Sequence, residues 1–421
     1  MSAPTAEMIC SMSYGGNSNW SGLPLDLMEL ILQNLTIMDY LKCRQICKSW
    51  QNMVDDAIST KGKCPPKPHF PLLLHPTHTI LHPIDLIEQK YYTLPTELKD
   101  GTSLKWLIGE KTWCSQRNNV EHYVNVFTSV EGWLVIQDYF NKRWKEQYQF
   151  WGLICFYNPV SRAMIKLPKL CFTTEENDSY ESSKVVVSSK PDCEESIVVI
   201  LLFQYYSDHR LFFCNVRGIS WTEIEIKHSP EICYSDIAIH GSKLYAITKV
   251  GCSEYVVVYN LSNPNVVTSE RIVMVQQGFT FPHWKLECYA YEKSFLLIDS
   301  TCGDLFIVQC KLRYEDDFGQ WPKEFAVYKL DKSGPRWLKI ESFDDRVLLL
   351  DDKGVQFTTN LDGSCMKSMS RNCVYFSLST KFSRETVNSV GVFSLIDKEI
   401  KCFLPFLVHE VGSVWFTPSL W

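Results

Sequence analysis

The sequence predicts a small all-α module followed by an all-β propeller of six to eight blades. Three observations lead to this prediction. Apolar residues recur at helical spacing over residues 20–54, a proline-rich stretch interrupts the chain at residues 59–83, and the rest alternates short β-rich apolar runs with Gly, Asn, Asp and Ser. We expect a disordered tail at residues 1–19, the helical module at 20–60, a linker at 61–69 and the propeller at 70–421.

The helical module is predicted to begin at Pro24. Proline suits the first helical position because its missing N–H has no partner to lose there, and Asp26 in the first turn faces the positive end of the helix dipole. Leu27, Leu30 and Ile31 then recur at helical spacing. These residues predict a first helix with one strongly apolar face.

Thr36 and Asp39 have the spacing of a capping box, which predicts the start of a second helix. That helix is expected to carry Leu41, Ile46, Cys47 and Trp50 on its apolar positions. Residues 20–54 are fewer than ~40, the length below which a lone domain usually needs help from a disulfide, a metal or a partner. A partner surface is the simplest help, although the helices could also belong to the core of the following domain.

This segment resembles the F-box. The residues that carry the resemblance are Leu23-Pro24, Asp26, Ile31-Leu32, Leu35, Asp39 and Ile46-Cys47-Lys48-Ser49-Trp50. Asp26 stands where Glu is commoner, Ile46 replaces Val, and Tyr40-Leu41 replaces a more usual Leu-Leu. The resemblance implies binding to the Skp-type adaptor of a cullin-RING ubiquitin ligase, through Leu23, Pro24, Leu27, Ile31, Leu35, Leu41, Ile46, Cys47 and Trp50.

The proline-rich stretch contains histidines and a cysteine that we do not expect to bind a metal ion. His69, His75, His78 and His82 lie near Cys64, but prolines break the spacing and no second ligand pair follows. No C-x-x-C pair occurs in the chain. We predict solvated or packing histidines, no metal site and no cofactor.

The second domain is predicted to be a propeller because short strands continue over about 350 residues, which at ~40 to 50 residues a blade gives six to eight blades. Residues 157–167, 214–224 and 328–340 each read as strand, turn and new strand, like the outer hairpin of a blade. Ring closure is expected to pair residues 71–75 with 402–408, with Trp415, Phe416 and Trp421 packing beyond them. A pair of β-sandwiches is the alternative, but it would need a domain break that the composition does not show.

The segment F-Y-N-P-V-S-R at residues 156–162 and the ending V-G-S-V-W-F-T-P-S-L-W from Val411 resemble plant F-box proteins with a KIB-type propeller. This resemblance implies a substrate receptor of an SCF-type ligase, whose propeller binds the protein to be ubiquitinated. A kelch-like oxidase or hydrolase with an F-box, and a scaffold without a role in degradation, are the alternatives.

Composition limits the other function classes. Forty-two Lys and Arg against 48 Asp and Glu, without a block of like charges, argue against nucleic acid as a partner. The apolar run at residues 197–203 is far short of the ~20 residues of a membrane span. Seventeen scattered cysteines fit reduced thiols, so we expect a cytoplasmic or nuclear protein.

Catalytic motifs are missing from the sequence. It contains no G-x-S-x-G, Walker loop, G-x-G-x-x-G or H-E-x-x-H. The adjacent pairs Asp344-Asp345 and Asp351-Asp352 could be paired carboxylates, but turn formation explains them better. We therefore expect a non-catalytic protein.

The substrate surface is predicted on residues 138–150, which are interpreted as a long loop between two strands. Arg143, Trp144 and Tyr148 belong to residue types that dominate interface hot spots. The alternative is that the same side chains pack a blade against its neighbour.

Overall fold

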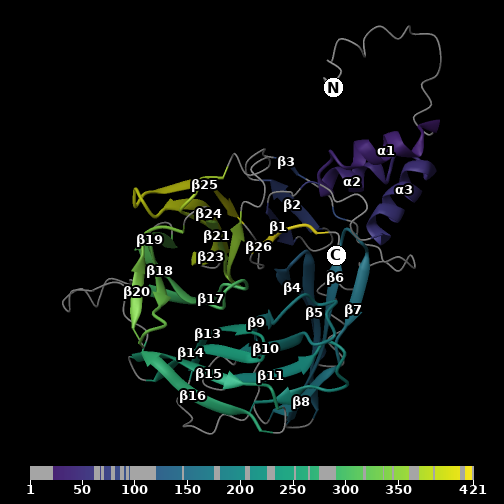
Figure 1. Ribbon diagram of the computed structural model, residues 1–421. Helices are drawn as coiled ribbons and strands as arrows, with labels where there is room; N and C mark the ends of the chain where they lie inside the picture. Colours follow the sequence, from purple (N-terminus) through teal and green to yellow (C-terminus); the bar gives the residue numbers. More distant parts are fainter. Residues whose placement is uncertain are drawn as a thin grey trace. The chain divides into compact units, whose positions relative to one another are not determined.

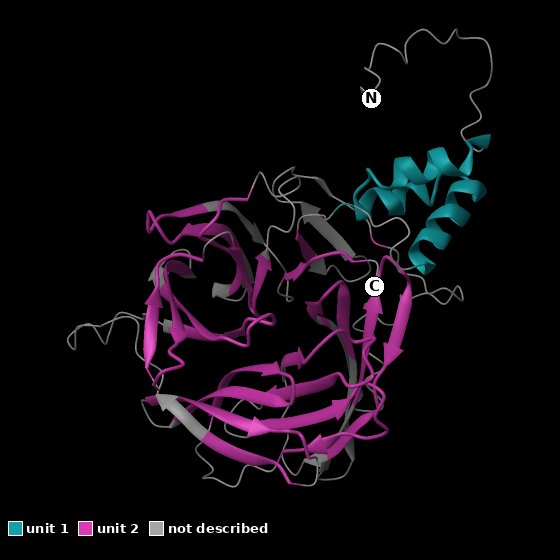
Figure 2. Ribbon diagram, in the orientation of Figure 1, with its two compact units in different colours: residues 1–68 teal, residues 69–421 magenta. Residues whose placement is uncertain are grey.

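The computed structural model describes residues 22–60, 67, 71–76, 81–85, 90–91, 94, 120–144, 147–174, 181–203, 209–224, 233–250, 253–263, 266–274, 291–315, 319–334, 336–343, 346–359, 369–382, 385–407 and 413–419. The predicted tail and most of the predicted linker lie outside these residues. The chain divides into two compact units, residues 1–68 and 69–421 (Figure 2).

Three helices form the first unit: α1 (Leu25–Leu32), α2 (Ile37–Cys43) and α3 (Lys48–Ser59). Pro24 is the N-cap of α1 and not its first helical residue as predicted, so the helix begins one residue later, at Leu25. The Pro24 carbonyl accepts hydrogen bonds from the N–H groups of Leu27 and Met28, both at 3.1 Å. None of these described helices has the length and apolarity needed to cross a membrane.

The predicted capping box is confirmed at the start of α2. The Asp39 N–H donates to Thr36 Oγ1, and the Thr36 N–H donates to Asp39 Oδ2, both at 3.3 Å. This reciprocal pair satisfies two N–H groups that the first helical turn leaves without intrahelical partners.

The prediction of one helix carrying residues 41–50 is wrong, because the chain breaks between α2 and α3. Cys47 is the extended N-cap of α3, and Arg44 bonds to Asp55 at 2.7 Å. No proline or glycine marks the break. Packing of α3 against α2 sets it, with a buried core of Met28, Leu32, Ile37, Met38, Tyr40, Leu41, Trp50, Val54, Ala57 and Ile58.

The second unit is a β-propeller whose sheets surround a common centre (Figure 1). Four blades follow one another along the chain. The first blade contains β4 (Val120–Val130), β5 (Trp133–Trp144), β6 (Gln147–Asn158) and β7 (Ala163–Lys166), and β8 (Leu170–Thr174) also pairs with β6; the second contains β9 (Glu181–Val187), β10 (Ile197–Phe203), β11 (Arg210–Asn215) and β12 (Thr222–Glu223). The third contains β13 (Cys233–His240), β14 (Lys243–Val250), β15 (Ser253–Asn260) and β16 (Thr268–Met274). The fourth contains β17 (Tyr291–Ile298), β18 (Leu305–Glu315), β19 (Gly319–Leu330) and β20 (Trp337–Ile340).

A fifth consecutive blade has an additional strand. It contains β21 (Arg346–Asp351), β22 (Gly354–Thr359), β23 (Cys373–Phe382), β24 (Glu385–Ser394) and β25 (Ile400–Leu407) in the order β22-β21-β23-β24-β25. The pair β21–β23 is parallel, whereas β21–β22 is antiparallel. The edge strand β22 contacts β17 of the preceding blade.

A composite sheet combines both ends of the propeller in the order β26-β1-β2-β3, with β1 (Leu72–Pro76), β2 (Leu81–Asp85), β3 (Lys90–Tyr91) and β26 (Val414–Phe416). The expectation of six to eight blades is therefore wrong: the described residues form five blades, each from one stretch of chain, and this composite sheet. The predicted number was too high because the blades are long. The fifth alone extends from residue 346 to residue 407.

The ring closes through a different C-terminal strand than predicted. Residues 402–407 belong to β25, which pairs with β24 within the fifth blade. The partner of β1 is β26, with Leu73 opposite Trp415. Trp415 and Phe416 thus form the closing strand itself, and Trp421 lies outside the described residues.

The three predicted outer hairpins are confirmed. Residues 157–167, 214–224 and 328–340 form the connections β6–β7, β11–β12 and β19–β20, each at the outer side of its sheet. In the first, the Asn158 side chain accepts the N–H groups of Val160 and Ser161, both at 2.9 Å, and Arg162 has φ of 57°. This explains the N-P-V-S-R segment as a turn held by its asparagine.

Candidate functional site

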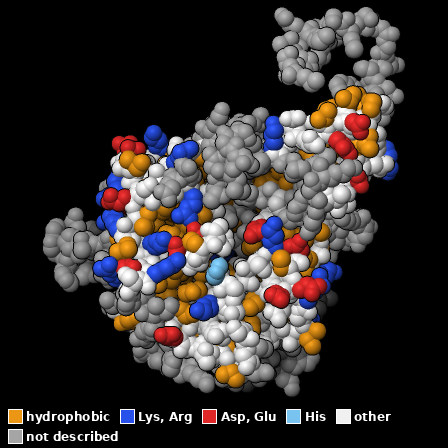
Figure 3. Space-filling view, in the orientation of Figure 1, with side chains coloured by type: hydrophobic (Ala, Val, Ile, Leu, Met, Phe, Trp, Pro, Cys, Tyr) orange, Lys and Arg blue, Asp and Glu red, His pale blue; other side chains and the backbone are white. Residues whose placement is uncertain are grey.

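Helix α1 exposes an apolar face. Leu27 and Leu30 are 49% and 56% exposed, and the half-buried Ile31 lies on the same face by helical spacing. The opposite face carries Met28 and Leu32, which are buried. Hydrophobic side chains gather at the surface of this unit in Figure 3. Exposed apolar residues concentrated on a short helix are typical of a protein interface.

Two further exposed apolar residues extend this set, Leu25 at 57% and Ile46 at 58%. We call Leu25, Leu27, Leu30 and Ile46 the apolar set. The sequence prediction named Leu27 and Ile46 but omitted Leu25 and Leu30 from the docking residues. Leu30 could have been included from helical periodicity, whereas only the exposure identifies Leu25.

The other predicted adaptor residues fall into two groups. Leu41 and Trp50 are buried in the core of the helical unit, so they support the exposed face rather than form it. Pro24 is exposed, and three others are half-buried: Leu23, Leu35 and Cys47. A pocket of about 320 Å³ between α1 and α3 includes Leu23 and Leu25 in its wall.

The propeller has a second candidate site, a pocket of about 390 Å³ bounded by the inner strands and their first turns. We call it the channel pocket. All five consecutive blades contribute to its wall, through residues such as Ser129, Lys184, His240, Thr301 and Asp351.

Polar contacts join neighbouring blades at this pocket. Lys184 on β9 forms an ion pair with Asp236 on β13, and Asp236 Oδ2 accepts the N–H of Leu296 on β17 at 2.6 Å. Burial raises the pKa of Asp236, although Lys184 and the N–H of Leu296 act against it. The absence of a side chain at Gly354 leaves room for the Lys184 ammonium, since a Cβ there would lie 3.2 Å from Nζ.

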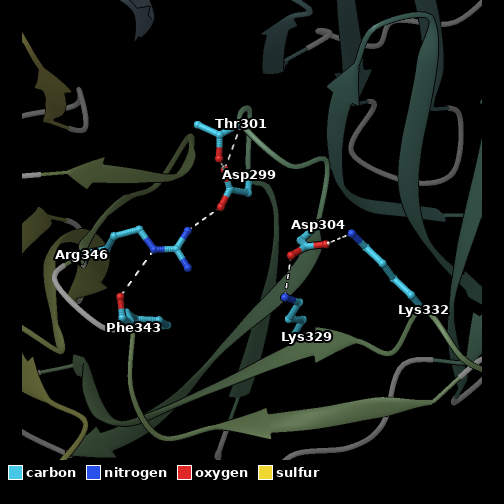
Figure 4. A network of polar contacts seen from close by, with 7 residues as sticks. All are labelled: Asp299, Thr301, Asp304, Lys329, Lys332, Phe343 and Arg346. Carbon is cyan, nitrogen blue, oxygen red and sulfur yellow. Dashed lines mark hydrogen bonds and ion pairs between the residues drawn. The ribbon is translucent and has the colours of Figure 1, made fainter.

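Arg346 makes the corresponding contact between β17 and β21. Its Nη1 donates to Asp299 (Figure 4). Its guanidinium carbon lies 4.2 Å from the centre of the Phe357 ring. Burial would raise the pKa of Asp299, but hydrogen bonds, those from Thr301 first and others from Cys302 and Arg346, lower it to about 2. Asp299 therefore stays ionised at neutral pH and holds Arg346 at the pocket.

Asp304, also shown in Figure 4, belongs to a separate ion cluster. It pairs with Lys329 at 2.5 Å and Lys332 at 2.6 Å. Hydrogen bonds from these two lysines outweigh burial and hold the pKa of Asp304 far below its usual range. Asp304 does not line the channel pocket, so this cluster only ties β18 to β19 and the following turn.

Asp351 connects the pocket to the closing strand. Its Oδ2 accepts the Trp415 N–H at 3.0 Å and its Oδ1 accepts the Lys353 N–H at 2.8 Å. Burial raises the pKa of Asp351 to about 7, and Asp352 acts in the same direction, while the two N–H groups and the charge of Lys184 oppose the shift. The carboxyl that the sequence suggested as a turn former thus fixes a turn and also anchors β26.

The predicted substrate loop is not a loop. Residues 138–144 and 147–150 belong to β5 and β6, and Arg143 is paired with Tyr148 and Trp144 with Gln147. The two strands pair without a break as far as Trp144 and Gln147. The side chains of Arg143, Trp144 and Tyr148 lie outside the described residues, so their proposed role remains a prediction.

No group of three or more His, Cys, Asp and Glu side chains in the described ranges could hold a metal ion. The candidate ligands Cys64, His69 and His78 lie outside those ranges, as do the side chains of His75 and His82.

Comparison with known families gives two matches. The F-box domain matches residues 20–61, and the KIB1-4 beta-propeller matches residues 109–394. The F-box protein At1g10110 of Arabidopsis thaliana is 21% identical over 445 residues, covering 96% of this chain and 97% of the relative. Another Arabidopsis protein, the probable F-box protein At4g22165, is 22% identical, with 97% and 99% covered.

A third relative shares only one stretch. The Arabidopsis F-box protein At1g69090 is 38% identical over 50 residues, which are 12% of each chain. Solved structures align more loosely. The crystal structure of a nidogen/laminin complex has a TM-score of 0.35 at 9% identity, with 82% of this chain and 98% of that chain covered.

Proposed function

Since this chain belongs to the KIB1-4 β-propeller family and carries an F-box domain, we propose that it is the substrate receptor of an SCF-type ubiquitin ligase. The helical unit binds a Skp-type adaptor and through it a cullin-RING ligase. The propeller binds the protein that is to be ubiquitinated, and the chain itself catalyses no reaction.

The apolar set carries this proposal. Its four side chains remain about half exposed in a unit that has already buried its own core. A small unit gains little stability from such residues unless a partner covers them. Binding of the adaptor would remove this apolar area from water.

We further propose that the protein works in the cytoplasm, the nucleus or both. The support is its 17 cysteines, an odd number at scattered positions. Reduced thiols are the rule in these compartments.

Binding of purified Skp-type adaptor to the full chain tests the proposal. Fully burying a leucine side chain is worth roughly 1.5 to 3 kcal/mol, so covering the exposed half of Leu27 and of Leu30 is worth about 1 kcal/mol each. The double variant Leu27→Ala, Leu30→Ala should therefore bind the adaptor about 30-fold more weakly. Deletion of residues 20–54 should abolish recovery of both adaptor and cullin.

The matched control is Ile219→Ala, which truncates an apolar side chain that is 97% exposed in the propeller. Its adaptor affinity should equal that of the parent chain. Equal affinity of the Leu27 and Leu30 double variant, with the helical content retained in circular dichroism, would refute the docking assignment.

A further inference from the structure

The channel pocket has the size of a peptide-binding site rather than of a domain interface. Its volume of about 390 Å³ accommodates one or two side chains. Because its wall comes from five blades, the positions of its polar groups depend on the closed ring and not on any single loop. Such a wall is well suited to hold groups at fixed positions.

The acceptor groups of the buried carboxylates in the pocket are already engaged. Asp299 Oδ1 accepts from the Thr301 N–H at 2.9 Å and the Thr301 hydroxyl at 2.5 Å, and Oδ2 accepts from Arg346. Both carboxyl oxygens of Asp351 accept backbone N–H groups, from Lys353 and Trp415. Each oxygen of these two carboxyls thus already accepts a hydrogen bond, which reduces their capacity for a cationic ligand.

The cations of the pocket retain donors. Among described residues, the Lys184 ammonium donates one of its three N–H bonds, to Asp236. The Arg346 guanidinium donates from Nη1 to Asp299 and from Nε to the Phe343 carbonyl at 3.4 Å, and its Nη2 group donates to no described residue. Arg346 is also 26% exposed, whereas Asp299 is 9% exposed.

The hydroxyl groups of Thr128, Ser188, Ser189 and Ser300 add further donors to the same wall. Those of Ser129 and Thr301 already donate to the Trp415 carbonyl and to Asp299. Unused guanidinium, ammonium and hydroxyl donors around occupied carboxylates favour a ligand that brings acceptor oxygens. Carboxylate groups of a peptide satisfy this requirement, and charge-assisted hydrogen bonds of this kind are about twice as strong as neutral ones.

We propose that the channel pocket binds a carboxylate side chain from an acidic segment of the target protein, with Arg346 and Lys184 as its main donors. This inference rests on the proposed function, because it assigns the chemical class of the target segment.

Fluorescence anisotropy with the full chain tests the proposal. The probes are labelled 12-residue Gly/Ser peptides that contain four Glu, four Gln, four Lys or four phosphoserine residues. The Glu peptide should bind at least tenfold more tightly than the Gln and Lys peptides, and its affinity should fall with added salt. Equal binding of the Glu and Lys peptides, no binding of the Glu peptide, or binding of the phosphoserine peptide alone would overturn the carboxylate assignment.

Variants locate the binding in the pocket. Arg346→Gln should weaken binding of the Glu peptide at least fivefold, and so should Lys353→Gln, which changes a lysine of the same wall on the β21–β22 turn. The matched control Lys339→Gln removes an exposed lysine from the outer strand β20 and should leave binding unchanged. Melting temperatures identify a variant that loses peptide binding because it unfolds. If the Arg346 variant unfolds, peptide binding by the Lys353 variant decides the outcome.

Adaptor binding is measured on the same preparations. A parent chain that binds the adaptor but not the Glu peptide refutes the pocket assignment alone, whereas a parent chain that does not bind the adaptor refutes the proposed function.

Discussion

Replacement of Trp415 by Ala should destabilise the propeller more than other single truncations, because this residue closes the ring. Its side chain is 2% exposed and packs with Leu73 and Tyr375. Its indole N–H donates to the Leu350 carbonyl at 2.9 Å, and its own carbonyl accepts from the Ser129 hydroxyl at 2.6 Å. Trp415 therefore joins the fifth blade, the composite sheet and the first blade.

The expected magnitude follows from these contacts. Truncation of a buried aromatic side chain to Ala costs about 3 to 5 kcal/mol, and the unsatisfied Leu350 carbonyl adds about 1 to 3 kcal/mol. A loss of roughly 4 to 8 kcal/mol is comparable to the whole stability of many domains. The variant should unfold at much lower urea concentration and aggregate through the exposed edges of β1 and β4.

Urea unfolding followed by far-UV circular dichroism measures this effect, with Trp415→Phe as the matched control. Phe retains most of the apolar volume and loses only the indole hydrogen bond, so it should cost about 1 to 3 kcal/mol. A midpoint for Trp415→Ala equal to that of the parent would refute the closure by β26. Equal losses for the Ala and Phe variants would show that packing of the ring is not what Trp415 contributes.

Two other predictions concern the cap of α2 and the carboxyl beneath the closing strand. Thr36→Ala removes the acceptor of the Asp39 N–H and should cost about 0.5 to 2 kcal/mol, seen as faster amide hydrogen exchange in α2 with the propeller unchanged. For Asp351 the sign follows from a pKa raised to about 7 in the folded chain, against ~3.9 in the unfolded chain. Its protonated form is favoured by folding, so this contribution is fully present below about pH 4 and is lost as pH rises to about 7. Asp351→Asn cannot titrate, so its stability relative to the parent should rise by roughly 2 to 3 kcal/mol between pH 5 and pH 8. Urea midpoints at the two pH values test this, and a difference independent of pH would contradict it.

Features that depend on neighbouring residues could be predicted from the sequence. The capping box of Thr36 and Asp39 and the outer hairpins at residues 157–167, 214–224 and 328–340 have the structure that their spacing indicated. Local hydrogen bonding and alternation along a strand determine both kinds of feature. The family assignment was accessible for the same reason, since the F-box pattern lies within one continuous stretch.

Features that depend on packing were predicted incorrectly. No residue type marks the break between α2 and α3, which Trp50 and Val54 set by packing into the core. The hairpin at Arg143 and Tyr148 was interpreted as a loop because polar residues interrupt its apolar alternation, although backbone pairing continues through them. The sequence thus lacked the information that the ladder of β5 and β6 supplies.

By itself, the sequence determined that a helical module precedes a propeller, because the helical and strand periods can be recognised from neighbouring residues. Only the tertiary structure decided which strand closes the ring and which groups line the channel pocket. Lys184 and Arg346 are far apart in the chain, and the ring brings them into one pocket wall, while Trp415 bonds to Asp351 of that wall. Residues 402–407 and 414–416 both form apolar strand segments. Because β24 pairs with residues 402–407, residues 414–416 are the segment that pairs with β1.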